Sequence, residues 1–273
     1  MMKRLAFCFF LSFFILLNHS AKADFVFSEI KAVYLSSRYI YNQNKIKKLE
    51  DLIVNTQANG IVIDYKDSSK PDQRQMINLV KRFNKAGAYT IARIVTFQDS
   101  YLAKRQPSAA ITNSKGELWY SGLRKWQRYW LDPASGIAQN YNIKIAKQAI
   151  DAGFDEIQFD YIRFPTDGNM QDIYYPVYNT SEKKSYTMRN FFAKLQKSLK
   201  TYKPSIKISI DIFGTVLSAG QINSIGQDLN DMTEYFDVIS PMTYPSHYNC
   251  GAFSVKDPNA HPYQVYCSSF KNS

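Results

Sequence analysis

The stretch GFDEIQFDYIRFPTDG, residues 153–168, combines the hydrophobic spacing of a buried β-strand with a carboxylate near its end. Every second residue from Ile157 to Tyr161 is apolar, and we expect these side chains to pack against helices. Gln158 and Asp160 lie between them and therefore point to the opposite face of the strand. A buried carboxylate is costly unless it is paired or used in chemistry. The stretch thus predicts a strand that presents Asp160 to a functional site.

Short apolar runs of this kind alternate with longer amphipathic segments along the rest of the chain. Strand-like runs cover residues 30–36, 60–66, 89–96, 154–161, 206–213 and 236–244. Helix-like segments cover about residues 42–58, 72–86, 138–152, 182–202 and 219–234. This order predicts βαβ units and a parallel sheet. No Gly-x-Gly-x-x-Gly motif follows the first run, so a (β/α)8 barrel of the TIM type is favoured, with a doubly wound sheet as the alternative.

Polar side chains occur where these predicted strands end, which is where barrels of this type carry their chemistry. Asp160 and Asp211 are the candidate catalytic residues, because two neighbouring carboxylates suit glycoside hydrolysis. One would act as nucleophile or base and the other as proton donor, and each carboxylate would shift the pKa of its neighbour. The assignment of the two roles stays open at this point. A structural salt bridge with Arg93 or Arg163 is the alternative reading of both aspartates.

Further residues at the predicted strand ends are candidates for substrate binding. They are Asp64, Lys66, Arg93, Tyr161, Arg163 and Tyr244. Asp64 and Lys66 are two residues apart in one strand, so we expect them to share a face. Aromatic side chains near strand ends, among them Trp119, Trp126 and Trp130, would offer flat apolar surfaces to sugar rings. No cluster of His or Glu accompanies these residues, so we predict neither a metal nor a cofactor.

The first 23 residues have the features of a secretory signal peptide. Lys3 and Arg4 precede an apolar run, and Ala21 and Ala23 form a small-x-small cleavage site. The apolar run is shorter than the ~20 residues of a membrane-spanning helix, which disfavours an uncleaved anchor. We therefore expect an exported domain, periplasmic or secreted, over residues 24–273, with no stable membrane span after cleavage.

Removing residues 1–23 lowers the formal net charge from +11 to +8, since three of the 34 basic residues and no acidic ones lie there. A basic protein is attracted to anionic lipids, glycans and nucleic acids. The basic residues are scattered, however, apart from groups such as Lys45–Lys48, where a solvated helix face is expected. Nucleic acid is therefore not an expected partner.

Two cysteines remain after Cys8 leaves with the signal peptide. Cys250 and Cys267 form an even pair in a chain bound for an oxidising compartment, which makes a disulfide between them a candidate. Two free thiols fit the sequence equally well, because spacing alone fixes no geometry.

The chain resembles the DUF4015 glycoside hydrolase family, a TIM-barrel group within the wider glycosidase superfamily. The segments that carry the resemblance are VIDYKD (62–67), AYTIARIVTFQDSYLAKRQP (88–107), WLDPAS (130–135), the stretch quoted above, SIDIFG (209–214), IGQDL (225–229), DVISPMTYPSHY (237–248) and HPY (261–263). The resemblance implies a barrel, a carbohydrate substrate, and Asp160 and Asp211 as the catalytic carboxylates. A chitinase-type signature fits less well, because Ile162 stands where its acidic Glu is required.

Only six strands are recognisable, and the last strands of the family have no counterpart before Ser273. We therefore expect a barrel that is incomplete at the C-terminus, from truncation or with completion by self-association through its open edges. The expected function is an exported glycoside hydrolase that cleaves O-glycosidic bonds in a cell-envelope or extracellular polysaccharide. The alternatives are a carbohydrate-binding or inactive remnant without turnover, and a polybasic protein that binds anionic lipid or nucleic acid.

Overall fold

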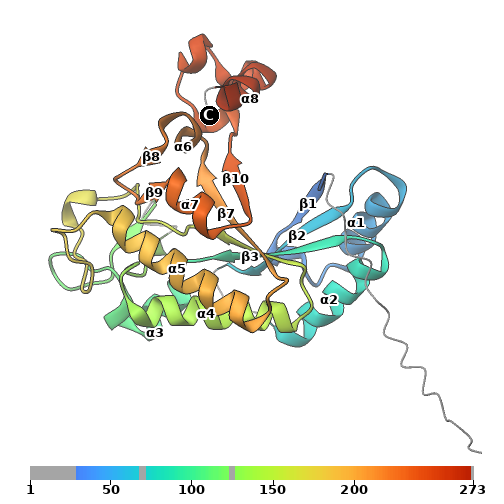
Figure 1. Cartoon of the computed structure of the whole chain (residues 1–273), viewed down its shortest axis with the longest axis horizontal. Helices are drawn as coiled ribbons and strands as arrows, with labels where there is room; N and C mark the ends of the chain where they lie inside the picture. The colour runs from blue at the N-terminus through green and yellow to red at the C-terminus, as the bar shows by residue number, and fades with distance from the viewer. Residues whose placement is uncertain (1–28, 68–71, 123–126, 272–273) are drawn as a thin grey trace, which may run out of the picture.

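The computed structural model describes residues 29–67, 72–122 and 127–271, and the expected signal peptide lies outside these ranges (Figure 1). A six-stranded parallel sheet forms its centre, with strand order β1–β2–β3–β6–β7–β10. These strands are β1 (Ala32–Leu35), β2 (Gly60–Lys66), β3 (Tyr89–Val95), β6 (Glu156–Asp160), β7 (Lys207–Phe213) and β10 (Val238–Met242). Each of the six predicted strands is present, so the expected βαβ organisation is confirmed.

The order of the strands in the sheet distinguishes the two fold classes that the sequence left open. Neighbouring strands follow the order of the chain, without the reversal that defines a doubly wound sheet. The sheet is curled, and its helices form an outer layer, as in a barrel wound in one direction (Figure 1). The fold is therefore an α/β half-barrel of the TIM type. Within the described residues β1 and β10 are its two edges, so the barrel is incomplete as predicted.

Eight α-helices are described in the same ranges. They are α1 (Gln43–Asn55), α2 (Gln73–Lys85), α3 (Ser100–Arg105), α4 (Gly136–Asp151), α5 (Lys184–Tyr202), α6 (Gly214–Ala219), α7 (Leu229–Tyr235) and α8 (Pro262–Lys271). Asn42, Asp72 and Ser135 cap α1, α2 and α4 by accepting a backbone N–H of the first turn. None of the described helices is both long and apolar enough to span a bilayer.

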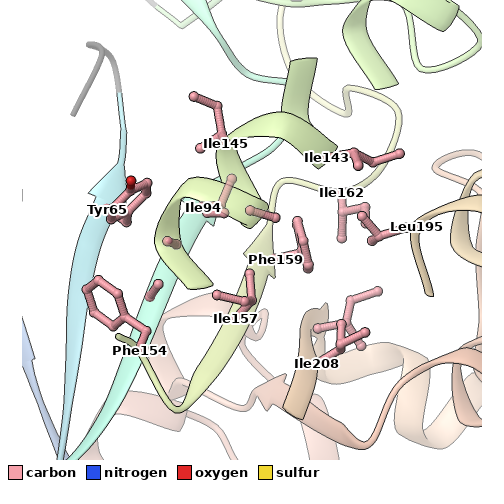
Figure 2. Close-up of a cluster of buried hydrophobic side chains, with 14 of the residues drawn as sticks. Tyr65, Ile94, Ile143, Ile145, Phe154, Ile157, Phe159, Ile162, Leu195 and Ile208 are labelled. Carbon is pink, nitrogen blue, oxygen red and sulfur yellow. The ribbon is translucent and has the colours of Figure 1, made fainter. Parts of the chain in front are cut away.

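The main core lies between the sheet and the outer helices. Figure 2 shows Ile157 and Phe159 of β6 in one cluster with Ile143 of α4 and Leu195 of α5. In β7, Ile208, Ile210 and Ile212 are fully buried, whereas the alternate residues face the inside of the curled sheet. The apolar alternation thus places one side of each strand against helices and leaves the other side free to form a site.

The segment 219–234 differs from the predicted single helix. It forms a short hairpin of β8 (Gln221–Ile222) and β9 (Gln227–Asp228) before α7 begins. Gly226 has a φ of +74° and lies against α5, where a Cβ atom would be 2.8 Å from the Lys184 carbonyl oxygen. The left-handed conformation and the close approach both require glycine, and they interrupt the helical pattern. A second short hairpin, β4 (Tyr120–Ser121) with β5 (Arg128–Tyr129), lies between α3 and α4.

Candidate active site

A cavity of about 560 Å³ lies on the inner face of the sheet, at the carboxyl ends of its strands. Its lining comes from all six strands and from the segments that follow β6 and β10. The lining includes six of the eight predicted site residues: Arg93, Asp160, Tyr161, Arg163, Asp211 and Tyr244. It also includes Tyr34, Gln158, Phe213, Ser240, Met242 and His247. The structure therefore brings the candidate catalytic pair and most candidate binding residues into one space.

Arg93 joins carboxylates from the strands on either side of β3. Its Nη1 donates to Asp64 Oδ1 at 2.6 Å, and its Nη2 and Nε donate to Asp160 Oδ2 at 2.5 and 3.1 Å. Asp64 is 2% exposed and also accepts from the Tyr34 hydroxyl at 2.6 Å and from the Ser37 N–H at 3.1 Å. Burial, together with the bond to Asp64, raises the pKa of Tyr34. Asp64 thus lies directly behind the cavity wall and holds Arg93 in place.

Asp160 stands where β6 ends and the chain turns. Its Oδ1 accepts the backbone N–H of Tyr161 at 2.7 Å, while its Oδ2 is occupied by Arg93. Tyr161 has a φ of +49°, an uncommon conformation for a residue with a Cβ atom. The strand alternation ends at this residue, and Tyr161 lines the cavity while it also packs against the hydrophobic core. Backbone strain of this kind is concentrated at functional sites.

Asp211 lies on β7, next to Asp160 of β6. The register pairs Phe159 with Ile210, which places the two aspartates one position further along neighbouring strands. Burial raises the pKa of Asp211 well above its ordinary value, and the negative charge of Asp160 raises it further. Gln158 Nε2 donates to Asp211 Oδ1 at 2.9 Å, which leaves Oδ2 to carry a proton. The cavity therefore holds one ion-paired carboxylate beside one whose protonated form is favoured.

Arg163 follows three residues after Asp160 and is 6% exposed. Its guanidinium lies 4.7 Å from the centre of the Phe213 ring, and 5.2 Å from those of Trp130 and Tyr161. Its Nη1 donates to the Phe164 carbonyl at 3.0 Å. Within the described part of the chain, no carboxylate lies within 4.0 Å of Arg163, which contrasts with the doubly paired Arg93.

The rim of the cavity carries aromatic rings that the solvent reaches. Tyr244 is 56% exposed, and its ring centre lies 5.1 Å from that of His247, in the short 3₁₀ turn Pro245–His247. Tyr34 is 52% exposed on β1. We predicted Tyr244 but neither His247 nor Tyr34. Tyr34 lies near the end of a predicted strand, so the reasoning that selected the other site residues could have selected it as well. His247 lies outside the strands, and its packing against Tyr244 brings it to the site.

The other aromatic candidates have structural places. Trp130 is fully buried and contributes to the wall around Arg163, where its Nε1 donates to Ser121 Oγ at 2.9 Å. Trp119 is 3% exposed and donates to the Asn169 carbonyl at 2.9 Å. Trp126 lies outside the described residues.

Lys66 does not lie at the cavity, which corrects the expectation that it shares a face with Asp64. The register of β2 against β3 shifts between these two residues: Asp64 pairs with Arg93, whereas Lys66 pairs with the next residue, Ile94. The irregularity turns Lys66 toward the helix layer, where its Nζ lies 2.8 Å from Asp99 Oδ2 and 3.0 Å from Asn142 Oδ1. Lys66 is 1% exposed, so its place is in the packing between sheet and helices.

The disulfide candidate is also corrected, because Cys250 and Cys267 are both free thiols. Cys250 is exposed, and Cys267 is partly buried on α8. Over residues 29–67, 72–122 and 127–271, no three His, Cys, Asp or Glu side chains are grouped as metal ligands.

Comparison with solved structures finds chains that are similar to this one. A hypothetical protein from Ruminiclostridium thermocellum is 29% identical, with a TM-score of 0.55 over 66% of this chain and 96% of that chain. An α-galactosidase from Thermus thermophilus is 15% identical, with a TM-score of 0.46 over 67% of this chain and 38% of that chain. A maltogenic α-amylase from Thermotoga neapolitana is 13% identical, with a TM-score of 0.49 over 78% of this chain and 49% of that chain. This chain therefore spans less than half the length of the last two enzymes.

The family comparison covers most of the sequence. No curated protein matches this chain. The model of the DUF4015 family, described as "Putative glycosyl hydrolase domain", matches residues 68–273 and so includes Arg93, Asp160, Arg163 and Asp211. Since this match extends over well more than half of the sequence, the chain belongs to the DUF4015 glycosyl hydrolase family.

Proposed function

We propose that this protein is an exported glycoside hydrolase in which Asp211 donates the proton and Asp160 is the nucleophile. One observation carries the proposal: two carboxylates on neighbouring strands face one cavity in different states. Asp160 forms an ion pair with the Arg93 guanidinium, as a charged carboxylate does. Burial and the charge of Asp160 favour the protonated form of Asp211. This division into one charged and one protonated carboxyl group is what glycosidic bond cleavage needs.

The reaction would proceed in two steps. Asp211 Oδ2 would protonate the leaving oxygen of the glycosidic bond while Asp160 attacks the anomeric carbon, which gives a covalent glycosyl-enzyme. Asp211, now deprotonated, would then take a proton from water as the water releases the sugar from Asp160. Retaining enzymes hold their two carboxyl groups about 5–5.5 Å apart. Neighbouring strands lie about 4.8 Å apart, so positions one strand apart fit retention of the anomeric configuration.

The substrate class and the location are parts of the same proposal. The exposed ring of Tyr244 beside His247 offers an apolar face at the rim, on which a sugar ring can stack. The charged head, apolar run and small-x-small site within residues 1–23 are those of a secretory signal peptide, which supports export. We therefore propose a cell-envelope or extracellular polysaccharide as the substrate.

The test is release of reducing ends from a panel of polysaccharides by the wild type, Asp160→Asn and Asp211→Asn. Both substitutions keep the size of the side chain, and loss of the proton donor alone is worth about 10²–10⁴-fold in rate. Asp160→Ala should regain turnover with added azide, which replaces a nucleophile. NMR of the first product should show retained anomeric configuration. Full activity in both Asn variants would refute the assignment.

A second candidate function is carbohydrate binding without turnover. It is favoured by the contacts of Asp160, because both of its oxygens already accept hydrogen bonds, from Arg93 and from the Tyr161 backbone. A carboxylate held in this way can serve as a structural salt bridge. This candidate predicts saturable binding of a glycan and no release of reducing ends by the wild type under any condition that allows binding.

A further inference from the structure

Arg163 is a buried cation in the cavity wall with which no carboxylate of the described residues forms an ion pair within 4.0 Å. Its side chain is 94% shielded, since the residue is 6% exposed, yet it lines the cavity that holds Asp160 and Asp211. An arginine in a protein stays protonated, so burial without a partner costs free energy. Burial lowers the pKa of the Arg163 guanidinium, which reports the same cost. The charges of Asp160 and Asp167 act on Arg163 from a longer distance and do not outweigh the effect of burial, so a direct anionic partner is missing from the described residues.

The surroundings of Arg163 fix its position but do not neutralise it. Phe213, Trp130 and Tyr161 pack around the guanidinium, and such ring contacts stabilise a cation without cancelling its charge. Nη1 uses its donors on the Phe164 carbonyl at 3.0 Å and more weakly on Thr166 Oγ1 at 3.4 Å. Nε and Nη2 have no hydrogen-bond acceptor within the described residues. One edge of a rigid, preoriented guanidinium thus remains available.

Arg93 provides the internal comparison. It lines the same cavity but donates to two carboxylates, so its charge is satisfied by Asp64 and Asp160. An unpaired arginine beside a paired one indicates that the two have different tasks. The paired arginine belongs to the carboxylate network, and the unpaired one is open to a ligand.

We propose that Arg163 binds an anionic substituent of the sugar, so that the substrate is an acidic glycan; this inference rests on the proposed function. The free edge of a guanidinium presents two parallel N–H groups, which match the two oxygens of a carboxylate, sulfate or phosphate. Because Arg163 is 6% exposed, the contact would lie in a largely shielded environment, which strengthens it. Carboxylate, sulfate and phosphate are all oxyanions, and the proposed ligand carries one of them on the sugar that lies in the cavity next to Asp160.

The test compares acidic oligosaccharides with neutral forms of the same chains. The background is Asp211→Asn in the full-length mature protein, because this variant should bind without cleaving. The probes are oligosaccharides of α-1,4-galacturonan and of hyaluronan, each with its methyl ester, and a chondroitin sulfate oligosaccharide with its desulfated form. Affinities are measured by isothermal titration calorimetry at physiological salt. The two kinds of probe separate carboxylate from sulfate as the source of the anion.

We expect at least one acidic probe to bind about tenfold or more tightly than its neutral form. Arg163→Gln should reduce that preference to less than twofold, and Arg163→Lys, which keeps the charge without the fork, should retain part of it. Arg82→Gln removes a positive charge on the outer helix layer and is the matched control, with the preference unchanged. No preference for any acidic probe, or a preference that survives Arg163→Gln, overturns the inference.

The outcome is distinguishable from that of the proposed function. Preference for an acidic glycan without release of reducing ends from it would refute hydrolysis and support recognition of the anion. Turnover of neutral glycans that depends on both aspartates, with no preference for acidic chains, would support hydrolysis and refute the role of Arg163. A circular dichroism spectrum and thermal melt of each variant establish that the comparison is made between folded proteins.

Discussion

Replacing Arg93 with Met tests whether the network behind the cavity is one buried electrostatic unit. Met keeps much of the apolar stem and removes the guanidinium, which donates three hydrogen bonds to Asp64 and Asp160. The two carboxylate side chains are only 2% and 10% exposed, and each would lose its cationic partner. The substitution therefore leaves two shielded negative charges beside each other.

The expected loss of stability follows from these contacts. Removing one partner of a buried ion pair costs about 3–5 kcal/mol. Asp64 keeps its bonds from Tyr34 and Ser37, Asp160 keeps one from Tyr161, and Arg93 itself is 18% exposed. We therefore expect the lower end, about 3 kcal/mol in the free energy of unfolding. For a domain of this size that corresponds to a Tm lower by about 6–12 °C.

Urea unfolding followed by far-UV circular dichroism measures this loss, with Arg82→Met as the matched control. Arg82 donates to both oxygens of Glu50 at 2.8 Å, but its side chain is 39% exposed, so its loss should cost less than about 1 kcal/mol. Adding Asp160→Asn to Arg93→Met should recover part of the loss, because one unpaired charge disappears. Equal losses for the two arginine variants, with no recovery in the double variant, would refute the reasoning.

Three further predictions concern other parts of the structure. Because the pKa of Asp211 is raised in the folded state, this residue contributes fully to stability below the ordinary Asp value of 3.8, and the contribution is lost as the pH rises through the folded-state pKa. Asp211→Asn should therefore flatten the fall in unfolding free energy above pH 4, by at most about 1.4 kcal/mol per pH unit. An unchanged slope would contradict this. Gly226→Ala should lower the free energy of unfolding, measured in urea, by about 2 kcal/mol or more, because the residue is left-handed and its Cβ would be 2.8 Å from the Lys184 carbonyl oxygen. A change near zero would exclude the tight turn. Lys66→Met should destabilise the fold by about 3–5 kcal/mol, because it leaves Asp99 unpaired. The KM for any substrate that the wild type cleaves should be unchanged. A raised KM with unchanged stability would show that Lys66 belongs to the binding site.

The six strands and four of the five long helices were predictable because their signals are local. Runs of β-branched residues such as GIVIDYK and IKISIDIF specify buried strands, and Asn42, Asp72 and Ser135 mark helix starts. The fifth helix failed as a prediction because its apolar period continues across Gly226, whose left-handed turn depends on contact with α5. Contacts between segments that are distant in sequence decide whether such a helix forms, and the hydrophobic periodicity of one segment carries no information about those contacts.

The site shows the same division between local and distant causes. Asp160 and Asp211 were found because strand direction and alternation alone bring them to one end of the sheet. Arg163 was selected as a binding residue from its place near a strand end. Its three aromatic neighbours and its lack of a direct ion pair arise from packing between β6, β7 and the segment before α4. The free thiols of Cys250 and Cys267 show the limit of counting residues, since an even number of cysteines does not bring two side chains together.

The shift in register within β2 separates two networks that the sequence places two residues apart. Asp64 reaches Arg93 on the concave side, whereas Lys66 reaches Asp99 under the helices, with the backbone of the sheet between them. Neither network shares a side chain with the other, so the free-energy effects of altering both should be additive. Natural variation at these two positions should accordingly be uncorrelated.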